Sequence, residues 1–241
     1  MARADVYVPA RVIGMSRIRR AFENRFRELL TDIGARERQK GVNWLVSRAQ
    51  SMALEERIDL SRALAKANLV LAQKVHRFLR RKGVAPPESA PKIICDAGLG
   101  GLARWLRAAG CETIWIQDIT DEALVNEAER TGAVVITTDS PLLDRKPIKE
   151  GRVRAYWVPP TLTKFEQLRL LRAELNLPEG ESRCMRCGGE VVQVNKEEMK
   201  ERIPPKTFKW VDEYFQCTRC GKLFWHGTHW NKIIKNLQET S

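Results

Sequence analysis

Two Cys-x-x-Cys pairs near the carboxy terminus constrain the fold of this chain more than any other feature of its sequence. The first pair is Cys184 and Cys187, the second is Cys217 and Cys220, and 29 residues separate them. Each pair can form a tight turn with both sulfurs on one side, and four thiolates complete the tetrahedral shell that zinc prefers. Such a shell has no open position for water, so we expect one structural Zn²⁺ ion. Residues 181–241 are therefore predicted to form a zinc ribbon.

The other two cysteines and the first residues of the chain indicate the cellular compartment in which we expect the protein. Cys95 and Cys111 lie in apolar runs and are predicted to be buried thiols. The chain starts without the apolar core of a secretory signal, and no run reaches the roughly 18 apolar residues that a membrane span needs. We expect a cytoplasmic protein without a membrane segment. In that compartment cysteines are kept reduced, so they are better suited to binding a metal than to forming disulfide bonds.

The net charge of +12 is concentrated in the first part of the chain. Residues 1–90 hold 19 Lys and Arg against 9 Asp and Glu, whereas residues 91–180 hold 12 against 13. A basic surface attracts polyanions by releasing their counterions, so RNA is the first partner to consider. The same charge distribution is expected if these basic residues only form the solvent-exposed faces of helices and bind no partner.

Apolar residues recur at helical spacing through the first third of the chain. One stripe begins at Ile18 and another at Leu60, with a third predicted helix between them. Gly34 and Gly41 lie where a helix is expected to stop. Residues 1–82 are thus predicted to be a basic helical segment, suited to RNA binding, to self-association or to a protein partner.

The following segment alternates between strand and helix patterns. The proline-rich residues 83–91 (GVAPPESAP) are predicted to be a linker. Within residues 92–180, four short apolar runs are separated by helical patterns. Strands this apolar are typical of a parallel sheet that is buried on both faces. The pattern therefore predicts an α/β unit with helices on both sides of the sheet.

Acidic residues collect after these predicted strands. They are Asp96 after the first strand, Asp118 and Asp121 after the second, and Asp139 and Asp144 after the third. Ligands bind beyond the carboxyl ends of parallel strands. Crowded carboxylates repel one another, and Mg²⁺ or Mn²⁺ removes that cost. A metal held in this way can activate water and stabilise charge on a phosphodiester, so all five acids are candidates for catalysis.

Several of these acids also have a purely structural interpretation. Asp121 can complement the amino end of its helix, and Asp118 can be a turn residue. The role of Asp144 is similarly open. Asp96 and Asp139 are the stronger candidates, because a carboxylate directly after a buried strand is costly without a partner.

Candidate RNA contacts occur in two places. Arg104 and Arg107 lie three residues apart on one predicted helix, where they can hold a phosphate or pair with the acids. In the ribbon, Lys222, Trp225 and His229 combine positive charge with aromatic faces, as single-stranded RNA binders do. Trp225 can equally be a core residue.

The motifs DAGLGGLARWLRAAGCETIW, VVITTDSPLL, SRCMRC and YFQCTRCGKLFWHGTHW together resemble the Mut-seven carboxy-terminal ribonuclease family. This resemblance covers roughly residues 92–232. The family is a branch of the PIN-like nucleases with an attached zinc ribbon. The resemblance implies a PIN-like three-layer α/β/α sandwich and metal-dependent RNA cleavage, with Asp96, Asp121 and Asp139 around the metal. It also implies that a motif including Arg104 and Arg107 shapes the site.

We therefore expect a metal-dependent ribonuclease that hydrolyses RNA phosphodiester bonds, with the ribbon and the basic helices aiding RNA binding. The alternative is a non-catalytic RNA-binding or ribosome-associated adaptor that keeps the nuclease fold. The acids favour the enzyme. Thr138, which stands where the family usually has an arginine, and the basic amino-terminal segment keep the adaptor open. A toxin-like nuclease restrained by a partner is a third hypothesis.

Overall fold

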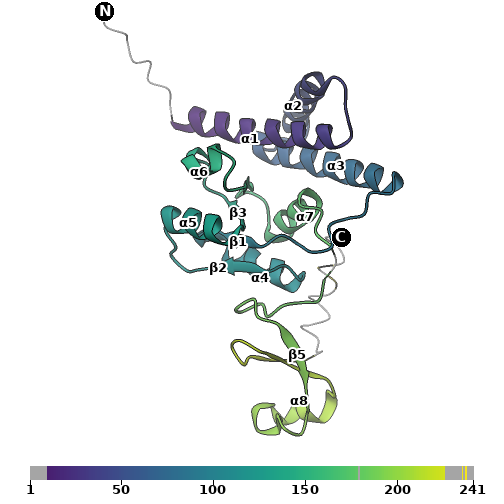
Figure 1. Ribbon diagram of the computed structural model, residues 1–241, viewed down its shortest axis with the longest axis vertical. Coiled ribbons are helices and arrows are strands. Elements are labelled where there is room, and N and C mark those ends of the chain that lie inside the picture. The colour runs from purple at the N-terminus through teal and green to yellow at the C-terminus, as the bar shows by residue number, and fades with distance from the viewer. Residues whose placement is uncertain (1–9, 179, 226–234, 236, 238–241) are drawn as a thin grey trace, which may run out of the picture.

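The chain forms three parts that follow one another along the long axis of the molecule (Figure 1). The computed structural model describes residues 10–178, 180–225, 235 and 237. The three parts are a group of amino-terminal helices, a unit built on a parallel sheet, and a small antiparallel ribbon. Among the described helices, none combines the length and the apolar character needed to cross a membrane.

Three long helices make up the first part, as the apolar spacing predicted. They are α1 (Ala10–Asp32), α2 (Arg38–Glu55) and α3 (Leu60–Arg81). Their apolar stripes meet, so that Phe22 and Phe26 of α1 and Leu64 of α3 have no exposed surface. At the start of α3, the Asp59 carboxylate accepts a hydrogen bond from the N–H of Arg62, which satisfies one of the unpaired donors of the first turn.

The two glycines expected to end a helix have different roles. Gly34 follows α1 with φ at +68°, a conformation that glycine adopts without steric cost. Gly41 lies inside α2, so the prediction is wrong there. A Cβ atom on Gly41 would come within 2.8 Å of Leu30 Cδ1. Gly41 therefore allows α1 and α2 to approach closely, and the cost of glycine in a helix is offset by this packing.

The second part is a four-stranded parallel sheet with the strand order β2-β1-β3-β4. The strands are β1 (Ile93–Cys95), β2 (Thr113–Trp115), β3 (Val134–Thr137) and β4 (Ala155–Trp157). All side chains of β1 and β3 are buried, because successive residues enter different cores on the two faces of the sheet.

Helices cover both faces of this sheet, which confirms the predicted α/β/α layering. The first core joins the sheet to α4 (Gly100–Ala108) and α7 (Lys164–Glu174), and the second joins it to α5 (Asp121–Thr131). Three short helices complete the unit: the 3-10 helices η1 (Ala97–Leu99) and η2 (Pro141–Asp144), and the α-helix α6 (Lys146–Lys149).

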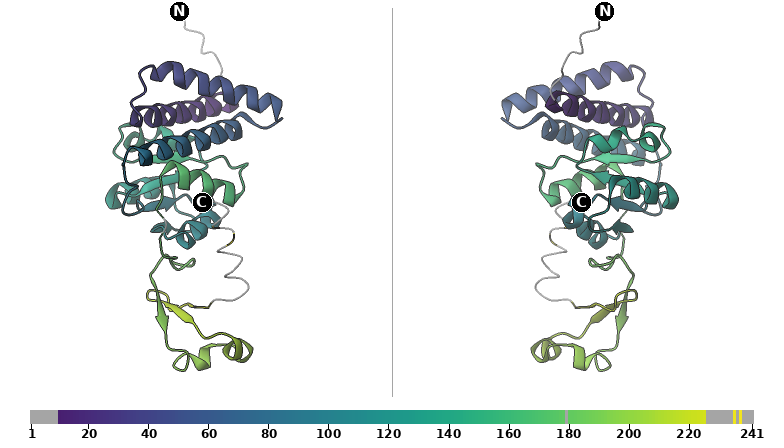
Figure 2. Two further views of the ribbon diagram at one scale, coloured as in Figure 1. Left: turned by 90° about the vertical axis from the view of Figure 1, so that its right-hand side faces the viewer. Right: turned by 90° about the vertical axis from the view of Figure 1, so that its left-hand side faces the viewer.

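The amino-terminal helices pack directly on the sheet unit and share its first core (Figure 2). The Phe22 ring of α1 meets the Trp157 ring of β4 edge-on, with centroids 6.3 Å apart. Helix α3 packs along α7. Residues 83–91, the predicted linker, contain neither helix nor strand. The helices and the sheet are therefore continuous in their packing, although the chain between them is irregular.

A buried ion pair lies where α1 meets α7. Arg25 Nε is 2.9 Å from Glu174 Oε1, and the two side chains are only 6% and 3% exposed. The Arg25 guanidinium also lies 4.7 Å from the centre of the Tyr156 ring, a cation–π distance. Burial raises the pKa of Glu174 to about 7, although the neighbouring Arg25 acts in the opposite direction.

The third part is a ribbon of three antiparallel strands in the order β5-β6-β7. The strands are β5 (Val191–Val194), β6 (Tyr214–Cys217) and β7 (Leu223–Trp225). Between β5 and β6 lie η3 (Lys200–Arg202) and α8 (Pro205–Trp210). Tyr214 is fully buried and packs against Trp225, so the ribbon has a small core of its own.

The buried ion pair generates a prediction about stability. The substitution Glu174→Ala leaves the Arg25 charge buried without its partner, and we expect the free energy of unfolding to fall by about 3–5 kcal/mol. Urea denaturation at pH 8, above the pKa of Glu174, measures this change. Glu55→Ala is the matched control, because Glu55 pairs with Arg48 at the surface, with both side chains at least half exposed. Equal losses for the two variants would show that the buried pair does not hold α1 to α7.

Candidate functional site

Two of the predicted acids lie at one edge of the parallel sheet. Asp96 follows β1, and Asp139 lies two residues beyond β3. Because β1 and β3 are parallel neighbours, their carboxyl ends meet at the same edge. The N–H of Asp96 donates to the carbonyl of Ile136 at 3.0 Å, which extends the pairing of the strands up to the acid.

The hydroxyl of Thr137 connects these two acids. It donates to Asp96 Oδ2 at 2.8 Å and accepts a hydrogen bond from the N–H of Asp139 at 2.9 Å. Thr137 has no exposed surface. Thr137 is not among the site residues expected from the sequence. Its signal in the sequence is a hydroxyl at the last position of a buried strand, two residues before an acid. Thr137 fixes the orientation of one carboxylate and the backbone of the other.

Asp121 joins the same group of charges from α5. It is the first residue of that helix, which Thr120 caps by accepting a hydrogen bond from the N–H of Ala123. Burial raises the pKa of Asp139, and the neighbouring carboxylates of Asp121 and Asp96 raise it further. The three acids therefore repel one another, and a divalent cation between them would remove that cost. Their charge and oxygen ligands fit Mg²⁺ or Mn²⁺.

The carboxylates lie less close together than the ligand groups of a complete metal-binding shell. Within the described part of the chain, they do not converge on one point as closely as the four cysteines do. The Asp121 carboxylate pairs with Arg145, with Nη2 and Oδ2 3.3 Å apart. Asp118 is exposed, with φ at +55°, on the turn between β2 and α5. This position agrees with the turn role that the sequence left open for it.

Asp144 differs from the other acids because two cations already contact it. Arg17 of α1 binds Asp144 Oδ2, and Lys149 Nζ lies 3.2 Å from Oδ1. Burial alone would raise the pKa of Asp144, but the hydrogen bonds from Arg17 and Lys149 lower it below its ordinary value. A carboxylate paired in this way is poorly placed to ligate a further cation. The contact also brings the amino-terminal helices to this edge of the sheet.

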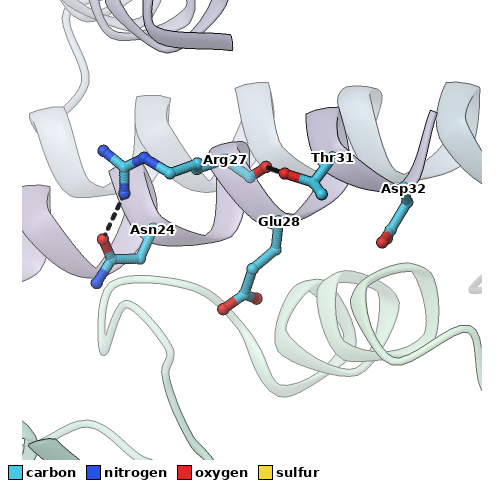
Figure 3. A pocket seen from close by; sticks show the side chains of 5 residues that line it. All are labelled: Asn24, Arg27, Glu28, Thr31 and Asp32. Carbon is cyan, nitrogen blue, oxygen red and sulfur yellow. Dashed lines mark hydrogen bonds between the residues drawn. The ribbon is translucent and has the colours of Figure 1, made fainter. Parts of the chain in front are cut away.

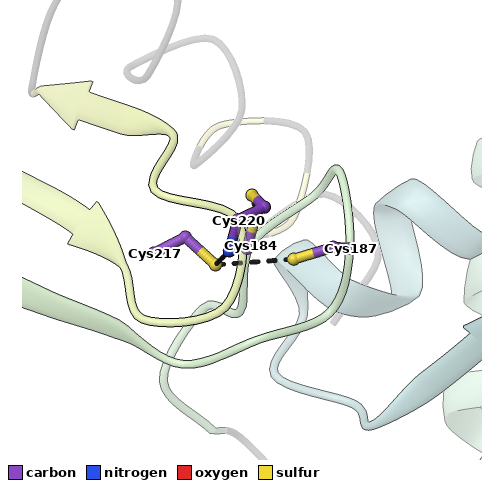
Figure 4. Close-up of side chains that lie close together, drawn as sticks. All are labelled: Cys184, Cys187, Cys217 and Cys220. Atoms are coloured by element: carbon purple, nitrogen blue, oxygen red, sulfur yellow. Dashed lines mark hydrogen bonds between the residues drawn. The ribbon is translucent and has the colours of Figure 1, made fainter.

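The four cysteines of the ribbon gather around one point, where they could hold a metal ion (Figure 4). Their sulfur atoms all lie within 4.8 Å of one another. Cys184 Sγ is 3.7 Å from Cys220 Sγ, and Cys187 Sγ is 3.4 Å from Cys217 Sγ. Thus each sulfur of one pair faces a sulfur of the other, as a tetrahedral shell requires.

Glycines shape both turns that carry the cysteines. Gly188 and Gly221 have φ values of +77° and +66°, and their N–H groups donate to the carbonyls of Cys184 and Cys217. A Cβ atom on Gly189 would come within 2.9 Å of the Cys217 sulfur, so a larger residue there would push the two turns apart. Both turns were predictable from the local sequence, because each cysteine pair is followed by glycine.

The other two cysteines are core residues, as predicted. Cys95 and Cys111 have no exposed surface. Burial raises the pKa of both thiols, in Cys111 to about 11. A buried protonated thiol is unreactive.

The predicted RNA contacts occupy varied positions. Arg104 is exposed on α4. Lys222 is exposed, and its Nζ lies 5.6 Å from the centre of the Phe224 ring. Trp225 is half-buried against Tyr214, which supports the core role that the sequence left open. His229 lies outside the described residues.

Arg107 does not have the position expected of an RNA contact. It is 3% exposed, and its Nε donates to the carbonyl of Thr113 at 2.9 Å. Its Nη1 donates to the carbonyls of Met185 and Arg186, which lie between the first two cysteines of the ribbon. In return, the carbonyl of Arg107 accepts from the N–H of Arg183. Arg107 therefore attaches the cysteine turn to α4 and β2.

A shallow pocket of about 360 Å³ beside the carboxy-terminal half of α1 is separate from these sites (Figure 3). Its lining residues are Asn24, Arg27, Glu28, Thr31 and Asp32. Arg27 donates to Asn24 Oδ1, and Thr31 donates to the carbonyl of Arg27. With two carboxylates against one guanidinium, the lining is acidic and does not suit a polyanion.

The attachment of the ribbon through Arg107 can be tested. Arg107→Gln removes the charged donors that three carbonyls accept, so we expect the Arg183 amide to lose protection from hydrogen exchange by at least about 10-fold. Hydrogen exchange followed residue by residue by NMR measures the change. Arg104→Gln is the matched control, because it alters an exposed arginine on the same helix. Unchanged protection in Arg107→Gln would contradict this role.

One comparison with known proteins agrees with this architecture. The model of the Mut7-C RNAse domain matches residues 91–237, which is more than half of the chain and contains both the acids and the cysteines. Neither the search of curated proteins nor the search of solved structures gave a match. The chain therefore belongs to the Mut7-C RNAse domain family.

Proposed function

We propose that this protein is a metal-dependent ribonuclease that hydrolyses RNA phosphodiester bonds beside Asp96, Asp121 and Asp139. The family match suggests a ribonuclease at the level of the family. The observation that carries the proposal to these residues is that the three acids lie together at one sheet edge, where burial first and then the charges of Asp121 and Asp96 raise the pKa of Asp139. Carboxylates in this arrangement suit a divalent cation better than they suit one another.

Each residue near the edge has a distinct part in the proposed reaction. When bound, Mg²⁺ or Mn²⁺ supplies an activated water and neutralises charge on the phosphate. Asp96, Asp121 and Asp139 would hold it. Thr137 keeps the Asp96 carboxylate oriented through its hydroxyl. Arg145, 3.3 Å from Asp121, is about half exposed and can turn to a phosphate once the acid is engaged elsewhere.

The amino-terminal helices support binding of a polyanion. A shallow pocket of about 460 Å³ lies where α1 turns into α2. Its lining includes four cations and one acid: Arg27, Arg36, Arg38, Lys40 and Glu37. Excess positive charge of this kind raises the local concentration of RNA and speeds its association. We propose that this surface, together with Arg104 and Lys222, draws RNA to the protein.

We propose zinc as the ion of the four cysteines, with a structural role. A tetrahedral zinc site with Zn–S bonds of about 2.3 Å has sulfur atoms about 3.8 Å apart. The two facing pairs at 3.7 and 3.4 Å are close to that spacing. Burial alone would raise the pKa of Cys217, but the N–H groups of Cys220 and Arg219 lower it to about 7. The thiolate that zinc needs is thus favoured at Cys217, whereas burial raises the pKa of the Cys184 and Cys187 thiols, so these two must lose their protons when the metal binds.

The nuclease proposal predicts cleavage that requires both a metal and the acids. We expect the chain to cleave labelled RNA with Mn²⁺ or Mg²⁺ and not with EDTA. Asp96→Asn and Asp139→Asn should each lower the rate by more than about 100-fold, because the carboxylate that holds the cation is lost. Thr137→Val, which removes only the orienting hydroxyl, should lower it about 10-fold. Binding without cleavage under every metal condition would instead support the adaptor.

The zinc proposal predicts about one zinc ion per purified chain, measured by elemental mass spectrometry. Cys187→Ser and Cys217→Ser each remove a ligand, and we expect both variants to lose the ion. Cys111→Ala changes a buried cysteine outside the ribbon and should keep it. Iron in place of zinc, or an unchanged zinc content in the two serine variants, would contradict the assignment.

A further inference from the structure

Helix α1 is held against the loop that carries Asp139. A Cβ atom on Gly14 would lie 3.7 Å from Ser140 Oγ, so the helix backbone is close to the residue that follows the acid. Two turns further on, Phe22 packs on Trp157, whose indole N–H donates to the carbonyl of Thr138 at 2.8 Å. The stretch of α1 from Gly14 to Phe22 is therefore fixed beside the candidate site at two points.

The charges at this contact are unequal. The single carboxylate of Asp144 faces two cations, Arg17 of α1 and Lys149 of α6. Asp144 therefore balances only one of these two positive charges, and the other remains next to the acids of the candidate site. The Arg17 side chain is 27% exposed and that of Lys149 is 56% exposed, so both are partly accessible to a ligand. The Arg17 charge is also within electrostatic range of the Asp139 carboxylate.

The chemistry of the two side chains suits a phosphate group. Arg17 contacts Asp144 through Nε, and a guanidinium carries four further N–H donors in a planar fork that matches phosphate oxygens. The lysine ammonium adds a point charge with three donors. A carboxylate that contacts both cations holds them in position without using their full hydrogen-bonding capacity.

We propose that Arg17 and Lys149 form a phosphate-binding subsite for the RNA strand beside Asp139, and that Asp144 positions these two cations. This inference rests on the proposed ribonuclease activity. It adds to the site a residue from α1, which lies outside residues 91–237 that the family model matches. In this arrangement Asp144 is a positioning residue for the subsite, and Asp96, Asp121 and Asp139 would hold the metal.

The test measures the affinity of the full chain for a single-stranded RNA oligonucleotide with Mn²⁺, in the Asp139→Asn background. Because cleavage is expected to be more than about 100-fold slower in that background, binding can be measured as the readout. We expect Arg17→Gln to weaken binding about 10-fold through loss of a charged hydrogen bond. The slope of log affinity against log salt should fall by about 0.7, the value for one phosphate contact on a single strand. Arg19→Gln removes the same charge from another face of α1 and should change neither quantity.

Asp144→Asn separates a subsite from a merely structural ion pair. It removes the carboxylate charge, while the Asn side-chain oxygen can still accept a hydrogen bond from Arg17 and keep it in place. Because both cations remain and their competing anion is gone, the subsite predicts equal or tighter RNA binding with an unchanged salt slope. Weakening as large as in Arg17→Gln would show that the pair only anchors α1 and would overturn the proposal. So would an Arg17→Gln variant that binds like Arg19→Gln. If the wild-type chain does not cleave RNA while Arg17→Gln weakens binding as expected, the nuclease proposal fails and the phosphate subsite stands.

Discussion

The parallel pairing of β1 with β3 sets the positions of Asp96 and Asp139, and the other parts of the candidate site are arranged around that pairing. Both strands are buried on both faces, so a shift of one residue would exchange every side chain between the two cores. The register is therefore strongly fixed. Thr137, at the end of β3, then orients the Asp96 carboxylate through its hydroxyl. This hydroxyl is fully buried and has few alternative partners. The sheet edge thus sets the positions of Asp96 and Asp139, whereas the start of α5 sets that of Asp121.

The amino-terminal helices are part of the same structural unit in energetic terms. Phe22 and Phe26 belong to the core that also contains Ile93 and Ile136 of the sheet. The buried pair of Arg25 and Glu174 adds a polar contact across the same interface. A basic segment with only electrostatic attraction for RNA would not need such burial. Its packing is better explained if α1 has a fixed position at the sheet edge.

Much of this architecture was predictable because its signals are local. Helical spacing predicted the three long helices, and the two cysteine pairs predicted the ribbon turns. The failures concern contacts between distant residues. Gly41 resembles a helix end in the sequence, yet its role depends on Leu30 of another helix. Arg107 resembles a surface arginine, yet its acceptors include Met185, 78 positions later. Sequence spacing does not encode such partners, and the domain boundaries and catalytic roles stay predictions.

The bonds of Arg107 also make the packing of the sheet unit depend on a segment that comes later in the chain. Helix α4 and β2 leave the ribosome before Met185 and Arg186, so the guanidinium then has the Thr113 carbonyl as an acceptor but not the two from the ribbon. A charged group in an apolar setting is costly until its acceptors are present. The packing around Arg107 is thus complete only once the cysteine turn is present, and a chain that stops short of the ribbon would leave this guanidinium without two of its three carbonyl acceptors.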